Sequence, residues 1–168
     1  MSIATDLAEI QLQEQVLQFA AFSAETAWAV GCHLRAEALR QKAAMTFAIE
    51  LAGRTLFYAA TGFPPADQME WIRRKRNVVM RFARSSYGVG LELEQQGKTL
   101  EQKYGLNVAE YATHGGGFPI VLHGTGCVGS VVASGLPQRA DHAMVVNALA
   151  AALNVEVVRL SPQAPQSA

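Results

Sequence analysis

The residue types that could do chemistry concentrate between Tyr111 and His142. This stretch holds seven of the fourteen glycines, three of the four histidines and one of the two cysteines. Glycine-rich backbone interleaved with β-branched runs predicts tight turns and close backbone approach, because glycine adopts conformations that a Cβ forbids. We therefore expect a ligand site, if the chain has one, to lie in this stretch.

His114 and the three glycines that follow it, Gly115, Gly116 and Gly117, present consecutive backbone N–H groups. Such a run predicts a concave anion-binding nest before a strand. The same letters occur in the oxyanion hole of some esterases, but that chemistry also needs a G-x-S-x-G nucleophile turn, which this chain lacks. The serine-hydrolase interpretation is therefore excluded.

The histidines and one carboxylate are the candidates for acid–base or metal chemistry. His114, Asp141 and His142 could act together, with His114 facing a cavity from its loop. The alternatives are a structural hydrogen bond for His114, and a helix-start carboxylate at Asp141 with a surface neighbour at His142. Adjacent helical residues point about 100° apart, which disfavours a shared target for Asp141 and His142. His123 is expected to be exposed at a hairpin tip.

Gly124, Gly126 and Gly129 match the G-x-G-x-x-G fingerprint of dinucleotide-binding proteins. That fingerprint needs a strand before it and a helix after it. Here the apolar runs 118–122 and 128–133 predict strands on both sides, so we interpret the glycines as the turn of a β-hairpin.

A predicted helix over 66–85 carries six of the fourteen basic residues. Arg73, Asn77, Arg81 and Arg84 follow helical spacing and form one polar stripe. The stripe is either a solvated face or an anion site, since arginine makes bidentate contacts with carboxylates and phosphates. If an anionic ligand binds, we expect it between Gly115–Gly117 and the arginines, chiefly Arg81 and also Arg84.

The remaining pattern predicts alternating helices and antiparallel hairpins, which indicates an α+β class. Ser23 is the expected N-cap of a helix from Ala24 that buries Ala27, Trp28, Gly31, Leu34 and Ala38 and leaves His33 solvated. Glycines 88 and 90 are expected to interrupt a helical continuation through 94. The other predicted helices are 6–15 and 137–153, with one helical turn within 99–111, and the other predicted strands are 17–22, 45–51, 55–60 and 155–160.

Composition limits the function classes. The chain has 168 residues, a net charge of zero and 17% charged residues, so we expect no nucleic-acid partner. Cys32 and Cys127 lack C-x-x-C spacing and predict reduced thiols, with no disulfide and no metal site. No leader or membrane span is expected, and the protein is expected to be cytoplasmic. Only seven charged residues follow Leu100, so this part is either core or a subunit interface.

Several strings together resemble one known family, over about residues 19–153. The chain is similar to the uncharacterised cytosolic branch (UPF family 0303) of the haem-degrading-domain family, which includes HbpS and GlcG. The strings that carry the resemblance are Ala27-Trp28 with Gly31, Arg54–Tyr58 (RTLFY), Trp71 with Lys75, Arg81-Phe82 followed by Ser85-Ser86-Tyr87, and then HGGGFPI, GTGCVGSV and SGLPQRADH.

The resemblance implies a profilin-like domain over 1–160, with a five-stranded antiparallel sheet flanked by helices, in a homo-oligomer; 161–168 reads as a disordered tail. It also implies haem as a candidate cofactor. Without a C-x-x-C-H string, haem would bind non-covalently, with His114, His123 or His142 as axial ligand and Arg81 or Arg84 at the propionates.

Three hypotheses remain open. The chain is an oligomeric module that binds a small molecule or tetrapyrrole, a small enzyme that uses His114 or His142, or an oligomeric interaction protein without chemistry of its own.

Overall fold

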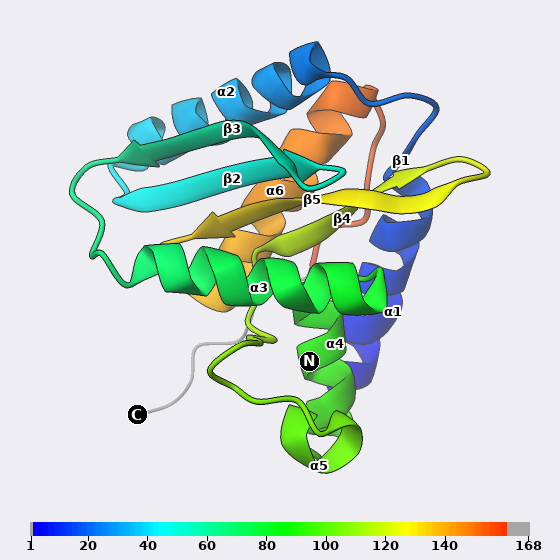
Figure 1. Cartoon of the computed structure of the whole chain (residues 1–168). Helices are drawn as coiled ribbons and strands as arrows, with labels where there is room; N and C mark the ends of the chain where they lie inside the picture. Colours follow the sequence, from blue (N-terminus) through cyan, green and yellow to red (C-terminus); the bar gives the residue numbers. More distant parts are fainter. Residues whose placement is uncertain (1, 161–168) are drawn as a thin grey trace.

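The computed structural model describes residues 2–160, in which six helices surround a five-stranded sheet of order β1-β4-β5-β2-β3 (Figure 1). The α+β class and the five-stranded sheet are confirmed. The elements along the chain are α1 (Ile3–Val16), β1 (Gln18–Phe19), α2 (Ala24–Arg40), β2 (Met45–Leu51), β3 (Arg54–Thr61), α3 (Gln68–Phe82), α4 (Ser86–Gln95), α5 (Leu100–Tyr104), β4 (Gly117–Leu122), β5 (Gly126–Ser134) and α6 (Gln138–Leu153).

Both predicted hairpins form. β2 pairs with β3, and β4 pairs with β5, in antiparallel register, and β2 joins the two hairpins by pairing with β5. The edge strand β1 differs from the expected antiparallel sheet, because it pairs with β4 in parallel, with Gln18 opposite Val121. It is only two residues long, so its direction is set by the path of the chain from α1 into α2 and not by a hairpin turn.

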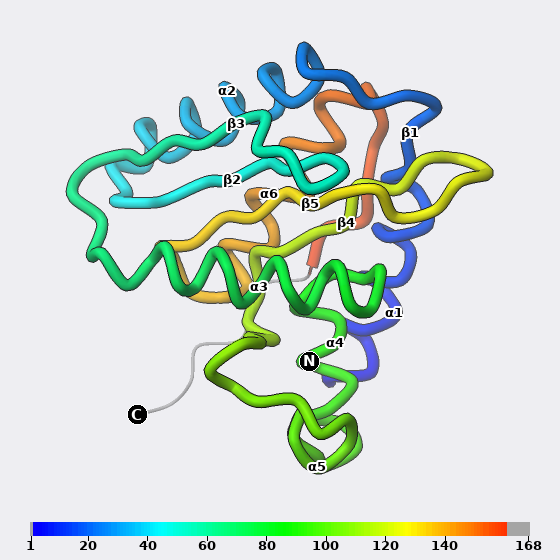
Figure 2. Tube along the Cα trace, in the orientation of Figure 1, coloured from blue at the N-terminus to red at the C-terminus, as the bar shows by residue number. Residues whose placement is uncertain are grey.

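The sheet separates two helical layers, as Figure 2 shows along the Cα trace. Helices α2 and α6 cover one face and α3 covers the other, while α4 and α5 project beyond the sheet and α1 packs against α4. The main core lies between the sheet and the α2–α6 layer, with Phe47, Phe118 and Leu149 among its fully buried members. A smaller hydrophobic cluster between α3 and the sheet contains Ala48, Ile72 and Val132.

The charge-poor C-terminal third belongs to this core. Phe118, Ile120, Val131, Val145 and Leu149 are at most 1% exposed within the single chain. The scarcity of charged residues after Leu100 is therefore explained by burial in the core of the single chain. An interface built on these side chains is not available, because the chain itself covers them.

Helix α2 begins where its sequence predicts. Ser23 accepts a hydrogen bond from the Thr26 N–H and forms a reciprocal capping box with it. Ala27, Leu34 and Ala38 are buried as expected. Trp28 is the exception, because it is 64% exposed; its ring meets that of Phe57 edge-on, at a centroid distance of 5.8 Å.

The segment after α3 is a separate helix and not an interrupted continuation. Helix α3 ends at Phe82, followed by Ala83 at φ +52°, and Ser85 caps the new helix α4 by accepting from the Gly88 N–H. Gly90 lies inside α4, where a Cβ would come within 2.4 Å of the Thr113 carbonyl oxygen. The glycines of α4 therefore permit close packing, and they do not break the helix.

The predicted edge strand over 155–160 does not form. This segment has no regular structure, and its Val158 carbonyl accepts a hydrogen bond from the Gln13 side chain of α1 at 2.7 Å. The segment predicted as a disordered tail, 161–168, lies outside the described residues. None of the helices in the described part of the chain has the length and apolar run needed to cross a membrane.

Candidate functional site

A buried ion pair joins the two helical layers at the end of β5. Lys75 Nζ of α3 lies 3.0 Å from Asp141 Oδ2 of α6 and donates a second hydrogen bond, also 3.0 Å, to the Ala133 carbonyl. The two side chains are 3% and 2% exposed. Charges are rarely buried this deeply unless they are paired, so this pair fixes both helices relative to the sheet.

Hydrogen bonding stabilises the charges of this pair, and burial opposes them. Asp141 Oδ1 accepts a hydrogen bond from the Leu136 N–H at 2.9 Å, and the first turn of α6 favours an anion. Burial raises the pKa of Asp141 against the opposing effect of Lys75. Burial also lowers the pKa of Lys75 against the opposing effect of Asp141. Both shifts bring the pKa values of the two groups closer together.

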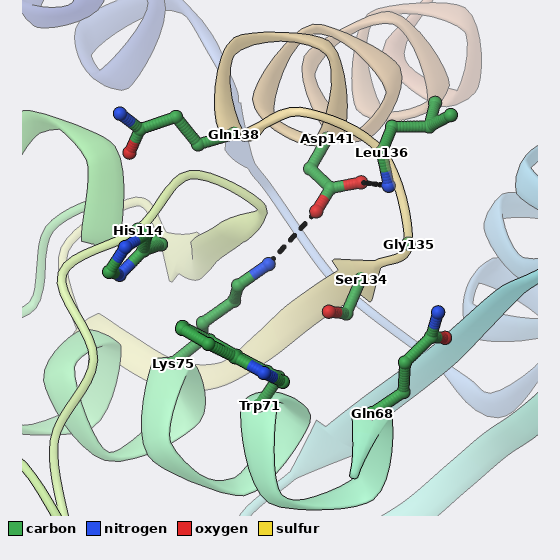
Figure 3. Close-up of a pocket in the computed structure, with 9 residues that line it drawn as sticks. All are labelled: Gln68, Trp71, Lys75, His114, Ser134, Gly135, Leu136, Gln138 and Asp141. Carbon is green, nitrogen blue, oxygen red and sulfur yellow. Dashed lines mark hydrogen bonds and ion pairs between the residues drawn. The ribbon is translucent and has the colours of Figure 1, made fainter. Parts of the chain in front are cut away.

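A cavity of about 250 Å³ opens beside the pair (Figure 3). Trp71 and His114 form part of its wall, with ring centroids 4.8 Å apart in an edge-to-face arrangement. The Trp71 indole N–H is held by Asp67 at 2.9 Å, and the Arg74 guanidinium lies 4.3 Å from the Trp71 ring centroid. The lining residues are Gln68, Trp71, Lys75, His114, Ser134, Gly135, Leu136, Gln138 and Asp141.

Three polar side chains of this lining are available to a ligand. The Ser134 hydroxyl, the Gln138 amide and the His114 ring make no hydrogen bond within residues 2–160. Gln68 is different, because its amide donates to the Ala44 carbonyl and accepts from the Thr46 hydroxyl. The cavity thus combines an aromatic wall, a buried ion pair and three unused polar groups, which is the composition of a small-molecule site.

His114 stands at the junction of this cavity with a second cleft of about 290 Å³. Burial, followed by the charges of Lys75 and Arg74, lowers the pKa of His114. The imidazole is therefore neutral at neutral pH, and it can accept a hydrogen bond or coordinate a metal. The second cleft also contains Arg74, Lys98 and several apolar side chains, among them Leu93, Leu100, Val108 and Tyr111.

The glycine loop reaches the site but is packed against protein. A Cβ on Gly115 would lie 2.0 Å from the Gln138 carbonyl oxygen, and Gly116, at φ +118°, would place one 2.9 Å from Lys75 Nζ. The Gly117 N–H donates to Ser86 Oγ at 2.9 Å, so it is not free for an anion. The loop therefore makes room for the Lys75 amine, and the open nest expected from the sequence is not seen.

The expected meeting of the arginine stripe with the glycine loop is not observed. Arg84 is held by Glu14 and Glu92 at 3.4 and 2.5 Å, and Arg81 is exposed. Neither lines the cavity, where Lys75 is the cation. Lys75 and Arg81 are six residues apart, which places them about 120° apart around the helix.

The expected grouping of His114, Asp141 and His142 does not form. His142 is 1% exposed, so the surface interpretation is wrong; its Nε2 lies 2.8 Å from Gln13 Oε1, beside the Tyr87 and Phe118 rings. Asp141 points instead to Lys75. Among residues 2–160, no three His, Cys, Asp or Glu side chains come together as a metal site. His123 and His33 are exposed, as expected.

Lys75 is the cavity residue that the charge pattern concealed. Its four-residue basic run suggested a solvated face, yet Lys75 follows Ile72 by three residues and precedes Val78 and Val79 by three and four, all of them buried. That helical spacing was the signal in the sequence that indicates burial of Lys75.

The environment of His142 predicts a pH effect on stability. Burial, with a smaller contribution from Arg139, lowers the pKa of His142 to about 3, whereas an unfolded histidine titrates near ~6.5. The unfolded chain therefore binds more protons below that pH. The free energy of unfolding should fall by about 1.4 kcal/mol per pH unit as the pH decreases below ~6.5.

Urea unfolding between pH 7 and 5 tests this expectation. His142→Gln, whose amide can still contact Gln13, should flatten the pH dependence, while His33→Gln on the exposed face of α2 should keep the wild-type slope. Equal slopes for all three proteins would show that His142 does not titrate as described.

The fold and the similarity of the sequence to known proteins define the class of this protein. The chain belongs to the HbpS-like family, whose model, described as haem degrading protein HbpS-like, matches residues 22–150. It is 52% identical over 153 residues to a UPF0303 protein of Burkholderia cenocepacia, covering 91% of this chain and 93% of the relative. A UPF0303 protein of Burkholderia mallei is 50% identical over the same length and the same shares.

Solved structures agree on the fold. The Ybr137w protein superposes with a TM-score of 0.82 at 30% identity, covering 88% of this chain and 87% of that one. HbpS matches with a TM-score of 0.61 at 20% identity, over 81% of this chain and 92% of its own. PduOC, in a complex with haem, matches with a TM-score of 0.65 at 18% identity, over 82% and 98%.

Proposed function

We propose that this protein is a small-molecule-binding module and that its ligand occupies the cavity beside the Lys75–Asp141 pair. The observation that carries the proposal is the convergence of unused polar groups on that cavity: Ser134, Gln138 and His114 face it without partners among the described residues. Ser134 is only 5% exposed, and buried polar groups normally have a hydrogen-bond partner, so a ligand that supplies oxygen or nitrogen atoms is expected there. His114 and Gln138 are exposed and open to the same ligand.

Haem is the first ligand to test, because the haem complex of PduOC and the name of the HbpS-like family support it. The residues of the cavity and of the adjoining cleft suit haem. His114 is neutral and accessible, as an axial ligand must be. Arg74 and Lys98 in the adjoining cleft supply cations for propionates beside apolar side chains for the ring. At about 250 Å³ the cavity alone lies below the roughly 300 Å³ of drug-sized sites, so a tetrapyrrole would extend into this cleft.

Absorbance titration with haemin tests the haem assignment. Binding should produce a saturable Soret change, and His114→Ala should weaken the affinity at least tenfold, equivalent to about 1.4 kcal/mol. His33→Ala and His123→Ala remove exposed histidines outside this cavity and should leave the affinity unchanged. Equal affinities for all four proteins would place haem elsewhere.

The arginines supply a second comparison in the same titration. Arg74→Ala removes a cation from the cleft and should weaken haemin binding, whereas Arg81→Ala, on another side of α3, should not. The reverse result would restore the arginine stripe as the anion site.

Homo-oligomerisation remains part of the proposal, on exposed side chains and not on the buried C-terminal third. Phe63 is 100% exposed and Met69, in the first turn of α3, is 60% exposed, so an interface beside the start of α3 would cover large apolar side chains. Light scattering at micromolar concentration should give a mass above that of one chain; a monomeric mass would remove this part of the proposal.

A further inference from the structure

The amine of Lys75 has bonding capacity that the folded chain leaves unused. An ammonium group has three N–H donors. Within residues 2–160 it meets two acceptors, the Ala133 carbonyl and Asp141 Oδ2. The Lys75 side chain lines the cavity, and one N–H donor of its ammonium group has no acceptor among the described residues.

A purely structural role does not account for these surroundings. A buried ion pair is weak evidence of stabilisation, because desolvation offsets most of its attraction. A pair that only joined α3 to α6 would also need no cavity beside it. Here the cavity is present, and Ser134 and Gln138, whose side chains make no hydrogen bond within residues 2–160, line it together with Lys75. This arrangement is that of a lysine presented to a ligand.

We propose that Lys75 forms an imine with a small aldehyde or ketone held in this cavity, an inference that rests on the cavity being a ligand site. The Lys75 ammonium passes a proton to Asp141, and the free amine attacks the carbonyl carbon. A nitrogen–carbon bond forms while the carbon–oxygen bond breaks. The oxygen leaves as water, carrying two protons that come from the Lys75 nitrogen by way of Asp141.

The reaction balances without any further reactant. One ammonium and one carbonyl compound give one protonated imine and one water, so neither an oxidant nor a reductant is required. Asp141 is placed to carry the protons, since its Oδ2 already contacts the amine at 3.0 Å. The opposed pKa shifts of the two groups, both caused by burial, agree with easy proton exchange between them. Activation of a lysine by burial is an established route to such chemistry.

Size and charge define the class of carbonyl compound. The cavity of about 250 Å³ admits a small molecule only. Because Asp141 already balances the charge of Lys75, the pair does not demand an anionic substrate. Ser134 and Gln138 suit hydroxyl or carbonyl oxygens, and Trp71 gives an apolar wall. A short hydroxyaldehyde such as glyceraldehyde has these properties and serves as the probe.

Reductive trapping tests the proposal on the intact wild-type protein. The protein is incubated at neutral pH with glyceraldehyde and cyanoborohydride, which reduces an imine to a stable secondary amine, and peptide mapping by mass spectrometry locates the label. The other lysines, Lys42, Lys98 and Lys103, are internal controls. Lys75 should be labelled at least tenfold faster than any of them, and the preference should vanish in urea. Lys75→Arg keeps a cation but should lose the fast label.

The outcome separates this inference from the proposed function. Labelling of Lys75 no faster than of the other lysines, or only in urea, would overturn imine formation. A haemin titration of the same preparation reports ligand binding independently, through the Soret band. Haemin binding without fast labelling would refute the imine and leave the site, whereas fast labelling without haemin binding would support the imine and refute haem as the ligand.

Discussion

Single replacements in the buried pair should be strongly destabilising. Lys75→Met leaves the Asp141 carboxylate unpaired, and Asp141→Asn leaves the Lys75 ammonium unpaired, each in a site that is at most 3% exposed. Removing one partner of a buried pair costs about 3–5 kcal/mol, because the remaining charge stays desolvated without compensation. Urea unfolding should show a lower midpoint for each variant.

The double variant is the informative control. Lys75→Met with Asp141→Asn removes both charges and keeps an acceptor for the Leu136 N–H, so much of the lost stability should return. Arg40→Ala, which breaks the exposed pair with Glu37, should cause no measurable change. Additive losses in the double variant would show that the two side chains are not coupled.

Replacing a glycine of the loop should be at least as damaging. A Cβ at Gly115 would lie 2.0 Å from the Gln138 carbonyl oxygen, and one at Gly116 would lie 2.2 Å from the Ala133 carbonyl oxygen, at φ +118°. Backbone atoms cannot yield as a flexible side chain can. We expect Gly115→Ala and Gly116→Ala each to cost more than about 4 kcal/mol, which lowers the melting temperature by roughly 8–16 °C.

Gly97 provides the matched control for these substitutions. It also has positive φ, +62°, but no atom lies within 4 Å of its ideal Cβ position. Gly97→Ala should therefore cost only the backbone strain, about 1–2 kcal/mol. Similar melting temperatures for the three variants would contradict the close packing described for the loop.

Local signals predicted the elements that local chemistry determines. The Ser23 cap begins α2 where the sequence places it, and the glycine turn at Gly124 joins the two strands expected around it. The dinucleotide fingerprint was correctly rejected, because β5 follows the glycines where that motif requires a helix. These features depend on few residues close in the chain, so a single sequence carries them.

Features decided by distant contacts were not predictable in the same way. The buried state of His142 depends on Gln13, 129 residues away, and that of Lys75 depends on Asp141, 66 residues away. The parallel pairing of β1 with β4 likewise joins segments that no turn connects. Trp28 follows the apolar spacing of α2 yet stays exposed, since nothing within the described chain covers it fully.

The placement of the ligand site can be tested through the two tryptophans. Trp71 lines the cavity on α3, and Trp28 lies on α2, on the opposite face of the sheet. Their indole N–H groups give two signals in a ¹⁵N-resolved spectrum, which Trp28→Phe assigns. On titration with a diamagnetic haem analogue, the Trp71 signal should shift saturably while the Trp28 signal stays in place. A saturable shift of Trp28 with an unchanged Trp71 would contradict the proposed site.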